Sequence, residues 1–413
     1  MGRVAGRFGR IEPRRTCERM VRGPLVELPR KNCWTIAEQV GDASPAVMHR
    51  FLSRGAWDHD GVRDDVARFV VDQLGCHGAV LLLDETGDVK KGTHTVGVQR
   101  QDSGTAGRIE NSQVVVAAAW ATPRGAAFID RELYVPVSWI DDPGRCAAAG
   151  LSDGLQSATK PALALLLVEH SLAAGRHAGW VAADEVYGND PTLRASLERH
   201  RIGHVLATSR SMRIPIGPAR IRADALAEAL PEHCWQTRPT DTSAKGPRWY
   251  QWAYLHLDDP EPPVVGQRYL LVRHSPTTGE TAFYWCWART SVGLNVLIRT
   301  AGVRWKIEEA FPTGKGLAGL DEHQVRRYVS WCRWTVLVML AHADLTVLAA
   351  EQPEPPDQVN LIPLTRNEIT HLLAVMHNQP QPTEHRLHWS TWRRCHQHTA
   401  QRCHYQRRQA TPL

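Results

Sequence analysis

Two apolar runs that each end in an aspartate constrain this chain more than any other feature. The run at 79–83 precedes Asp84, and the run at 179–183 precedes Asp184. Both runs have the length and composition of buried strands. A carboxylate buried at a strand is costly unless it is paired or binds a metal ion. We therefore expect a polar site where these two strands end.

Each aspartate also has an ordinary structural explanation. Asp84 can cap a turn at the end of its strand, and Asp184 can cap the N-terminus of a following helix. Glu85 and Glu185 adjoin the two aspartates. Because side chains alternate along a strand, both glutamates are expected to face away from the site, and we rank them lower.

A third carboxylate, Glu308, lies in the helical pattern RWKIEEAFPTGK at 304–315. Arg304 and Lys315 lie four residues before and seven residues after it, on the same helical face. Glu309 lies about a hundred degrees off that face. An ordinary salt bridge along the helix is the alternative to a site. Pro312 is expected to kink the helix.

If the three carboxylates converge, they can bind a pair of hard divalent cations. Carboxylate oxygens are the ligands that Mg²⁺ prefers, and Mn²⁺ accepts the same ligands. Two such ions about 4 Å apart clamp the attacking and leaving oxygens of a phosphodiester. This chemistry needs no serine or tyrosine nucleophile, and it predicts cleavage and joining of DNA.

The order of predicted elements is that of an α/β protein with a ribonuclease-H-like core. Residues 1–75 are predicted to be a helical, DNA-contacting region, with an ordinary solvated basic face as the alternative. The first part of the core spans 76–210, a β-rich insertion spans 211–288, and the helical remainder of the core spans 289–350. A linker, a helix and a basic tail occupy 351–413. Within the core we expect strands at 79–86, 93–99, 112–120, 128–136, 179–184 and 204–209, and helices at 160–175 and 191–200.

Composition favours a soluble globular protein of several lobes. Hydrophobic residues make up 43% and charged residues 22% of 413 residues, and a net charge of +6 permits a polyanionic partner. The N-terminus has no apolar signal segment, and the apolar stretch at 334–350 contains His342 and Asp344. We expect a buried helix there, no membrane span and a cytoplasmic location. The nine cysteines form no CxxC pair, which favours reduced thiols and disfavours zinc binding in the tail.

Three segments carry a family resemblance: DETGDVKKGTHTVGVQRQDSGTAGRIENSQV, ADEVYG and RWKIEEAFPTGKGLAGLDEHQVRR. They closely resemble the DDE transposases of bacterial insertion sequences. The best match is the insertion-sequence seven-oh-one group within the insertion-sequence four superfamily. The resemblance extends over most of the chain, and the strings KKGT and GTAGRIEN are its most specific parts.

The resemblance implies a catalytic, metal-binding triad of Asp84, Asp184 and Glu308 on a ribonuclease-H-like fold, with Mg²⁺ as the expected ion. The superfamily's Tyr-Arg-Glu-Lys signature maps onto Arg304, Glu308 and Lys315, so that Arg304 and Lys315 are expected to contact DNA. The signature tyrosine would fall on Ala301, and Trp305 is a candidate replacement.

The expected activity is binding of terminal inverted repeats, followed by two-metal cleavage and strand transfer on double-stranded DNA. A homodimer would pair the two element ends. Lys90 and Lys91 follow Asp84 and are candidates for the DNA path, with a solvated basic loop as the alternative. Two other functions stay open: a decaying or domesticated transposase that only binds DNA, and a ribonuclease-H-like nuclease outside transposition.

Overall fold

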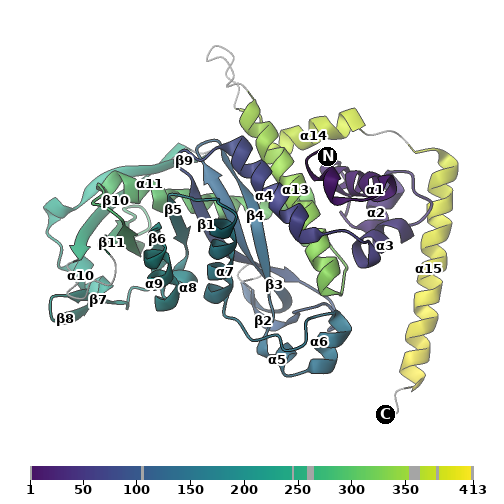
Figure 1. The fold of residues 1–413 in the computed structure, drawn as a ribbon, viewed down its shortest axis with the longest axis horizontal. Helices are drawn as coiled ribbons and strands as arrows, with labels where there is room; N and C mark the ends of the chain where they lie inside the picture. Colours follow the sequence, from purple (N-terminus) through teal and green to yellow (C-terminus); the bar gives the residue numbers. More distant parts are fainter. Residues whose placement is uncertain are drawn as a thin grey trace. The chain divides into compact units, whose positions relative to one another are not determined.

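The chain forms two compact units in a computed structural model (Figure 1). The structure describes residues 2–103, 107–243, 246–257, 265–352, 363–377 and 381–410. Residues 63–312 make up one unit, here called the sheet unit, and residues 1–62 with 313–413 make up the other, here called the helical unit. The five-segment division drawn from the sequence stays a prediction, and most of its linker at 351–358 lies outside the described residues.

The sheet unit is built on one ten-stranded mixed sheet with the order β2-β3-β1-β5-β6-β12-β11-β10-β9, in which β4 also pairs with β3. Strand β1 pairs antiparallel with β3 and parallel with β5, and β5 pairs parallel with β6. The strands are β1 (Val80–Val89), β2 (Gln99–Ser103), β3 (Arg108–Thr122), β4 (Gly125–Tyr134), β5 (Trp180–Ala183), β6 (Gly203–Thr208), β9 (Gln236–Ser243), β10 (Gly246–Leu257), β11 (Gln267–His274) and β12 (Thr281–Ala288).

Helices pack on this sheet and set where its strands end. Helix α7 lies against β3 and β4, and α11 lies against β5 and β6. Thr159 caps α7 and Asp190 caps α9, each by accepting a backbone N–H bond. The helices are α4 (His59–Leu74), α5 (Val137–Ile140), α6 (Pro143–Ala149), α7 (Lys160–Ala173), α8 (Glu185–Gly188), α9 (Pro191–Arg199), α10 (Ala223–Glu228), η3 (Glu232–Cys234), α11 (Leu294–Val303) and α12 (Trp305–Ala318). Helices α4 and α12 each cross from one unit into the other.

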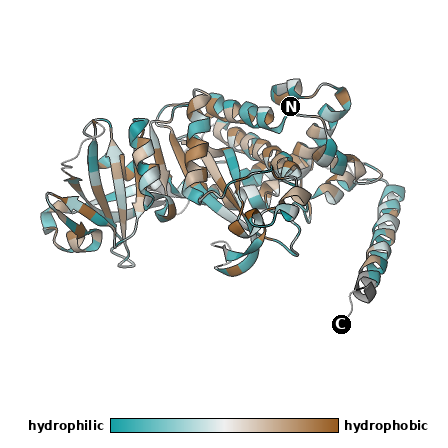
Figure 2. Cartoon of the chain, turned by 60° about the horizontal axis from the view of Figure 1, so that its bottom comes forward, coloured by the Kyte–Doolittle hydropathy of each residue, from teal (hydrophilic) through white to brown (hydrophobic). Residues whose placement is uncertain are grey.

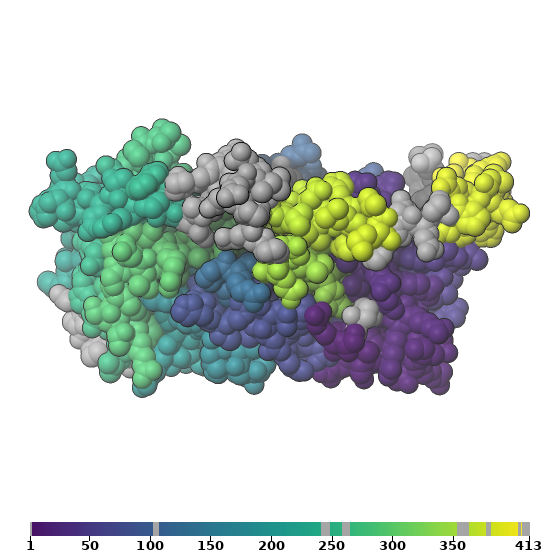
Figure 3. All heavy atoms as spheres, turned by 90° about the horizontal axis from the view of Figure 1, so that it is seen from above, coloured from purple at the N-terminus to yellow at the C-terminus, as the bar shows by residue number. Residues whose placement is uncertain are grey.

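The predicted β-rich insertion extends the central sheet. Strand β12 pairs antiparallel with β6, and β11, β10 and β9 follow in turn. Buried aromatic side chains of these strands, including Trp252 and Tyr269, pack in one cluster with Leu297 and Ile298 of α11. The remaining strands, β7 (Arg213–Ile216) and β8 (Ala219–Arg222), form a separate hairpin. Figure 3 shows the described residues of the insertion in teal to green.

The strand expected at 93–99 is wrong. The second strand of the sheet is instead β2, Gln99–Ser103, and the segment before it is a turn. Gly97 has a φ of +73°, a left-handed conformation that interrupts an extended chain. Val96 and Val98 are fully buried on either side of Gly97. The alternation of apolar and polar residues in this segment therefore reflects two valines that anchor a loop, and not one face of a strand.

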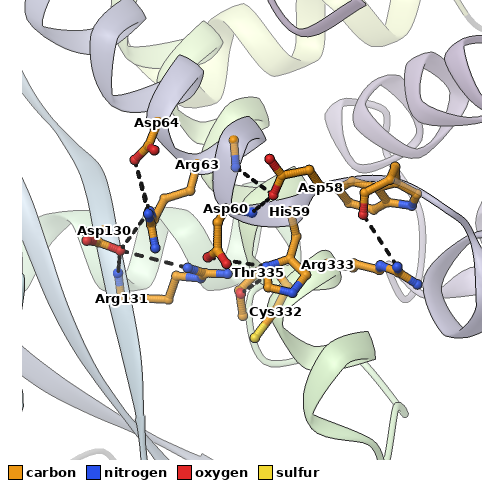
Figure 4. Close-up of polar contacts among 12 residues, drawn as sticks. Asp58, His59, Asp60, Arg63, Asp64, Asp130, Arg131, Cys332, Arg333 and Thr335 are labelled. Carbon is orange, nitrogen blue, oxygen red and sulfur yellow. Dashed lines mark hydrogen bonds and ion pairs between the residues drawn. The ribbon is translucent and has the colours of Figure 1, made fainter. Parts of the chain in front are cut away.

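A buried ion cluster surrounds Asp130 of β4 (Figure 4). Its carboxylate lies 3.6 Å from Arg63, 3.8 Å from Arg131 and 3.1 Å from Nδ1 of His170 on α7. Asp130 is only 2% exposed. Because two guanidinium groups and an imidazole share one carboxylate, the cluster joins α4, β4 and α7 through a single buried anion.

We expect this cluster to make the stability of the sheet unit depend on pH. The hydrogen bond to Asp130 raises the pKa of His170 above its ordinary value of 6.5. A raised histidine pKa stabilises the fold below the unfolded pKa and stops doing so as pH rises through the folded pKa. Denaturation measured between about pH 5.5 and 8 is expected to show this loss, and His170→Gln is expected to remove it. An unchanged pH profile in the variant would contradict the assignment.

The helical unit is organised around α13 (Tyr328–Glu351). This helix is the one candidate membrane span among the described residues by length and composition, but 72% of its apolar window is buried. Asp344 of this helix pairs with Arg3, at 3.2 Å. Figure 2 shows hydrophobic residues along this helix and in the central strands of the sheet. The other elements of the unit are η1 (Gly2–Arg7), α1 (Ile11–Arg22), η2 (Gly23–Leu25), α2 (Cys33–Gln39), α3 (Ala46–Arg54), α14 (Arg366–His377) and α15 (Thr383–Ala410).

Two cationic side chains of the helical unit serve packing. Arg333 of α13 donates to the carbonyl oxygens of Leu52 and Gly55 and lies over the Trp57 ring, 5.2 Å from its centroid. In the basic tail, Arg393 of α15 pairs with Glu38 at 2.6 Å.

The aromatic residues of the tail pack against the N-terminal helices of the same unit. Trp389 is fully buried and donates to the carbonyl oxygen of Asp42. Trp392 packs edge-on against Trp34, with 4.8 Å between the ring centroids. These rings therefore hold α15 in place.

Candidate active site

The structure brings Asp84 and Asp184 together. Leu83 of β1 is the register partner of Ala183 of β5, so the next residue of each parallel strand is an aspartate. Asp84 lies in the middle of β1, whereas Asp184 directly follows β5. The proximity expected from two strand-borne aspartates is confirmed.

Both carboxylates are perturbed by burial and by their neighbours. Burial raises the pKa of Asp84 to about 7, and repulsion from Asp184 is the next cause. Burial, followed by repulsion from Glu85, also raises the pKa of Asp184. Two adjacent, half-buried carboxylates that repel each other favour any cation that can lie between them.

Asp184 also has the helix-capping role that was given as its structural alternative. Its carboxylate accepts a hydrogen bond from the backbone N–H of Val186 at 2.9 Å and so caps α8. The cap fixes the direction of the side chain at the end of β5. A capping role and a ligand role are compatible, because a carboxylate has two oxygens and several lone pairs.

Glu308 joins this site through Arg304. The Arg304 guanidinium lies 2.6 Å from the Glu308 carboxylate, so the salt bridge given as the alternative is present. The pKa of Arg304 is lowered by burial but raised more by Glu308, Tyr284 and Asp84, which places its charge near Asp84 too. The charge of Arg304 therefore acts on the glutamate and on both aspartates.

A network around Glu85 was missed in the sequence. Lys160, at the start of α7, lies 2.7 Å from one carboxylate oxygen of Glu85, and the Tyr187 hydroxyl donates to the other at 2.5 Å. Tyr187 is fully buried and comes three residues after Asp184. The network therefore ties β1, α7 and α8 together beside the two aspartates. Tyr187, in the motif ADEVYG, was the only sign of this network in the sequence. The contact of Glu85 with Lys160 could not be seen there, because the two residues are 75 positions apart.

The donor set only partly fits a metal centre. Among the described residues, no three His, Cys, Asp or Glu side chains are grouped so that they could hold an ion. Asp84 and Asp184 present the hard oxygen donors that Mg²⁺ prefers, and their mutual repulsion suits a cation. The carboxylate of Glu308 is paired with Arg304. Glu308 therefore fits as a third ligand only if it leaves Arg304 and binds the ion instead.

The three lysines predicted to contact DNA are not part of the group formed by Asp84 and Asp184. Lys90 follows β1, and Asp84 is six residues before it, about 20 Å along an extended strand. Lys91 is exposed in the same turn. Lys315 lies in the part of α12 that belongs to the helical unit, and its contact with DNA stays a prediction.

Ala301 occupies the position where the Tyr-Arg-Glu-Lys signature has its tyrosine. Ala301 is buried in the cluster that packs α11 on the sheet. Trp305 is 44% exposed at the start of α12, and the Arg248 guanidinium lies 4.8 Å from its ring centroid. Trp305 is therefore available to contact a ligand, whereas residue 301 is not.

Known proteins resemble this chain in sequence. Residues 3–223 match the family described as DDE superfamily endonuclease. A probable transposase for insertion sequence element IS701 from Microchaete diplosiphon is 30% identical over 167 residues, which are 40% of this chain and 41% of that protein. The match thus spans less than half of the relative.

One solved structure resembles the fold weakly. It is the synaptic complex of piggyBac transposase with hairpin DNA, with a TM-score of 0.42, 9% identity, 84% of this chain covered and 63% of that chain. The family match spans more than half of the 413 residues and includes both aspartates. On this match, and in agreement with the resemblance of its motifs, the chain belongs to the DDE superfamily of endonucleases.

Proposed function

We propose that this protein is an insertion-sequence transposase that cleaves double-stranded DNA at the ends of its element and joins them to a target. The observation that carries the proposal is the pair of half-buried aspartates on adjacent strands, together with the Arg304–Glu308 ion pair, whose arginine acts electrostatically on both aspartates. Asp84, Asp184 and Glu308 are the proposed catalytic residues and Mg²⁺ ligands. The transposase name of the IS701 relative supports the same activity.

The strand order supports a ribonuclease-H-like core. Strands β4, β3, β1, β5 and β6 lie side by side, with β3 antiparallel and β5 and β6 parallel to β1. In such a core the first strand carries one carboxylate and the fourth strand ends near another. The positions of Asp84 and Asp184 agree with that arrangement.

Each side chain has a distinct role in this proposal. Bound divalent ions would activate a water or a 3′-hydroxyl and stabilise the leaving oxygen. Asp84 and Asp184 would hold such an ion through their carboxylate oxygens, and the backbone N–H of Val186 orients Asp184. Arg304 holds Glu308 until a phosphate or an ion draws one of the two partners away, because guanidinium groups bind phosphate as well as carboxylate.

The partners follow from the same activity. Two element ends must be held together for joining, so we propose a homodimer in the DNA complex, acting in the cytoplasm. Arg304 and Lys315 are proposed DNA contacts, as are Lys90 and Lys91 at the far end of β1. Membership of the DDE superfamily of endonucleases supports DNA as the partner.

A matched pair of glutamate variants tests the third ligand. Glu308→Gln is expected to stop Mg²⁺-dependent nicking of an element-end duplex while DNA binding persists. Glu309→Gln is expected to retain most activity, because Glu309 is exposed and lies on another face of α12. A dead Glu309 variant beside an active Glu308 variant would show that the helix face was assigned incorrectly.

Binding and nicking assays on the wild-type protein, together with the DNA beside its gene, distinguish the proposal from its two alternatives. Binding without nicking of any end sequence in Mg²⁺ would favour a decaying transposase that only binds DNA. Terminal inverted repeats beside the gene would count against a nuclease outside transposition. The same assay, run with Mn²⁺ and with chelator, measures the metal requirement.

A further inference from the structure

A cavity of the sheet unit lies away from the two aspartates. Its volume is about 630 Å³, and it is formed by the residues before β1, the β3–β4 turn, β9 and α11 with the start of α12. Gly78 and Thr122 line it at the amino-terminal end of β1. Asp84 is six residues beyond Gly78, which puts the cavity about 20 Å along the strand from the candidate active site.

The wall of this cavity is cationic. Its described lining includes Arg238, Arg299, Lys306 and His77, and no aspartate or glutamate is among those lining residues. The three segments that supply these side chains are far apart in sequence. A cavity with basic groups from several elements and no lining carboxylate is suited to an anion.

The cations are held at the wall by neutral groups. Nζ of Lys306 donates to the carbonyl oxygen of Thr122 at 2.9 Å, and Nη2 of Arg238 donates to Oε1 of Gln236 at 3.3 Å. These contacts position the two side chains at the wall of the cavity. Arg238 and Arg299 are both exposed, so each can reach a ligand.

Helix α12 connects the cavity to the candidate active site. Lys306 lies two residues before Glu308, which is about 200° around the helix. The helix therefore presents Glu308 toward Arg304, and Lys306 toward Thr122. A ligand that contacts both sides of the helix would have to be extended and to carry repeated negative charge, as a nucleic-acid duplex does.

We propose that this cavity binds backbone phosphates of duplex DNA and so anchors the duplex beyond the cleaved bond. The proposal rests on the proposed function, because it takes DNA to be the substrate. Ile298 and Val303 provide apolar surface in the same cavity, against which deoxyribose can pack. The arginines supply charge-assisted hydrogen bonds to phosphate oxygens. The site contributes affinity and register and takes no part in the chemistry.

The salt dependence of DNA binding tests this site directly. The full-length double variant Arg238→Gln/Arg299→Gln is compared with the wild type on a mixed-sequence duplex over a range of salt concentrations. Loss of two phosphate contacts is expected to lower the slope of log K against log salt by about 1.8. The matched control is Arg220→Gln/Arg289→Gln, which removes two exposed arginines of the same unit that do not line the cavity. The control is expected to keep the wild-type slope.

Several outcomes would overturn the inference. An unchanged slope in the cavity variant would do so, as would an equal loss in both double variants, since that would reflect overall charge alone. Saturable binding of inorganic phosphate that the cavity variant loses, with the duplex slope unchanged, would assign the cavity to a small anion. If the wild type binds no duplex at any salt concentration, the proposed DNA partner fails together with the site. Circular dichroism and melting curves confirm that all variants are folded.

Discussion

Replacing Asp184 with asparagine is expected to abolish DNA cleavage and to leave the fold intact. Asparagine caps a helix about as well as aspartate, so the hydrogen bond from the Val186 N–H is preserved. The substitution removes the charge that is proposed to bind the metal ions. We expect the cleavage rate in Mg²⁺ to fall on the order of a thousandfold or more. Single-turnover cleavage of an element-end duplex measures the fall.

The same variant separates a role in catalysis from a role in folding. Asp84 and Asp184 repel each other at the half-buried site, so removal of one charge is expected to leave the melting temperature unchanged or raised. Glu185→Gln is the control, because Glu185 is exposed and contacts only Asn189 among the hydrogen bonds of the described residues. Near-normal cleavage by Asp184→Asn would remove the basis of the proposed function.

Replacing Asp130 with alanine is expected to cost the sheet unit about 3–5 kcal/mol of unfolding free energy. The carboxylate is the shared partner of Arg63, Arg131 and His170. Its removal leaves cationic groups in a site where Asp130 was 2% exposed and Arg131 4% exposed. Chemical denaturation followed by tryptophan fluorescence measures the loss.

A neighbouring aspartate provides the matched control for this prediction. Asp64 also pairs with Arg63, at 3.1 Å, but its side chain is 40% exposed. Asp64→Ala is expected to cost about 1 kcal/mol or less, because exposed ion pairs contribute little. Equal losses in the two variants would mean that burial of the Asp130 cluster does not set its contribution.

Much of the core was predictable because its strands are short, apolar and separated by clear breaks. The strand that carries Asp84 and the strand before Asp184 both form, and they are neighbours as expected. The Arg304–Glu308 contact was also predictable, because a spacing of four residues on a helix brings side chains together. These features depend on local periodicity, which a single sequence contains.

Features that depend on pairing between distant segments could not be predicted. Periodicity identified the strands of the insertion but could not show that β12 pairs with β6. The contacts of Glu85 with Lys160 and Tyr187 join positions 75 and 102 residues apart. The alternation of Val96 and Val98 suggested a strand, because period two does not distinguish a strand from a turn with two anchored valines.

The pairing of β12 with β6 also determines which parts of the gene can be removed. Without residues 209–288, β6 would become an exposed edge strand, and its unpaired N–H and C=O groups would invite association with other chains. Trp252 and Tyr269 would be lost from the layer that supports α11, the helix directly before Arg304. A minimal nuclease trimmed from this protein must therefore retain the whole segment, and natural shortening of such elements is expected to spare it.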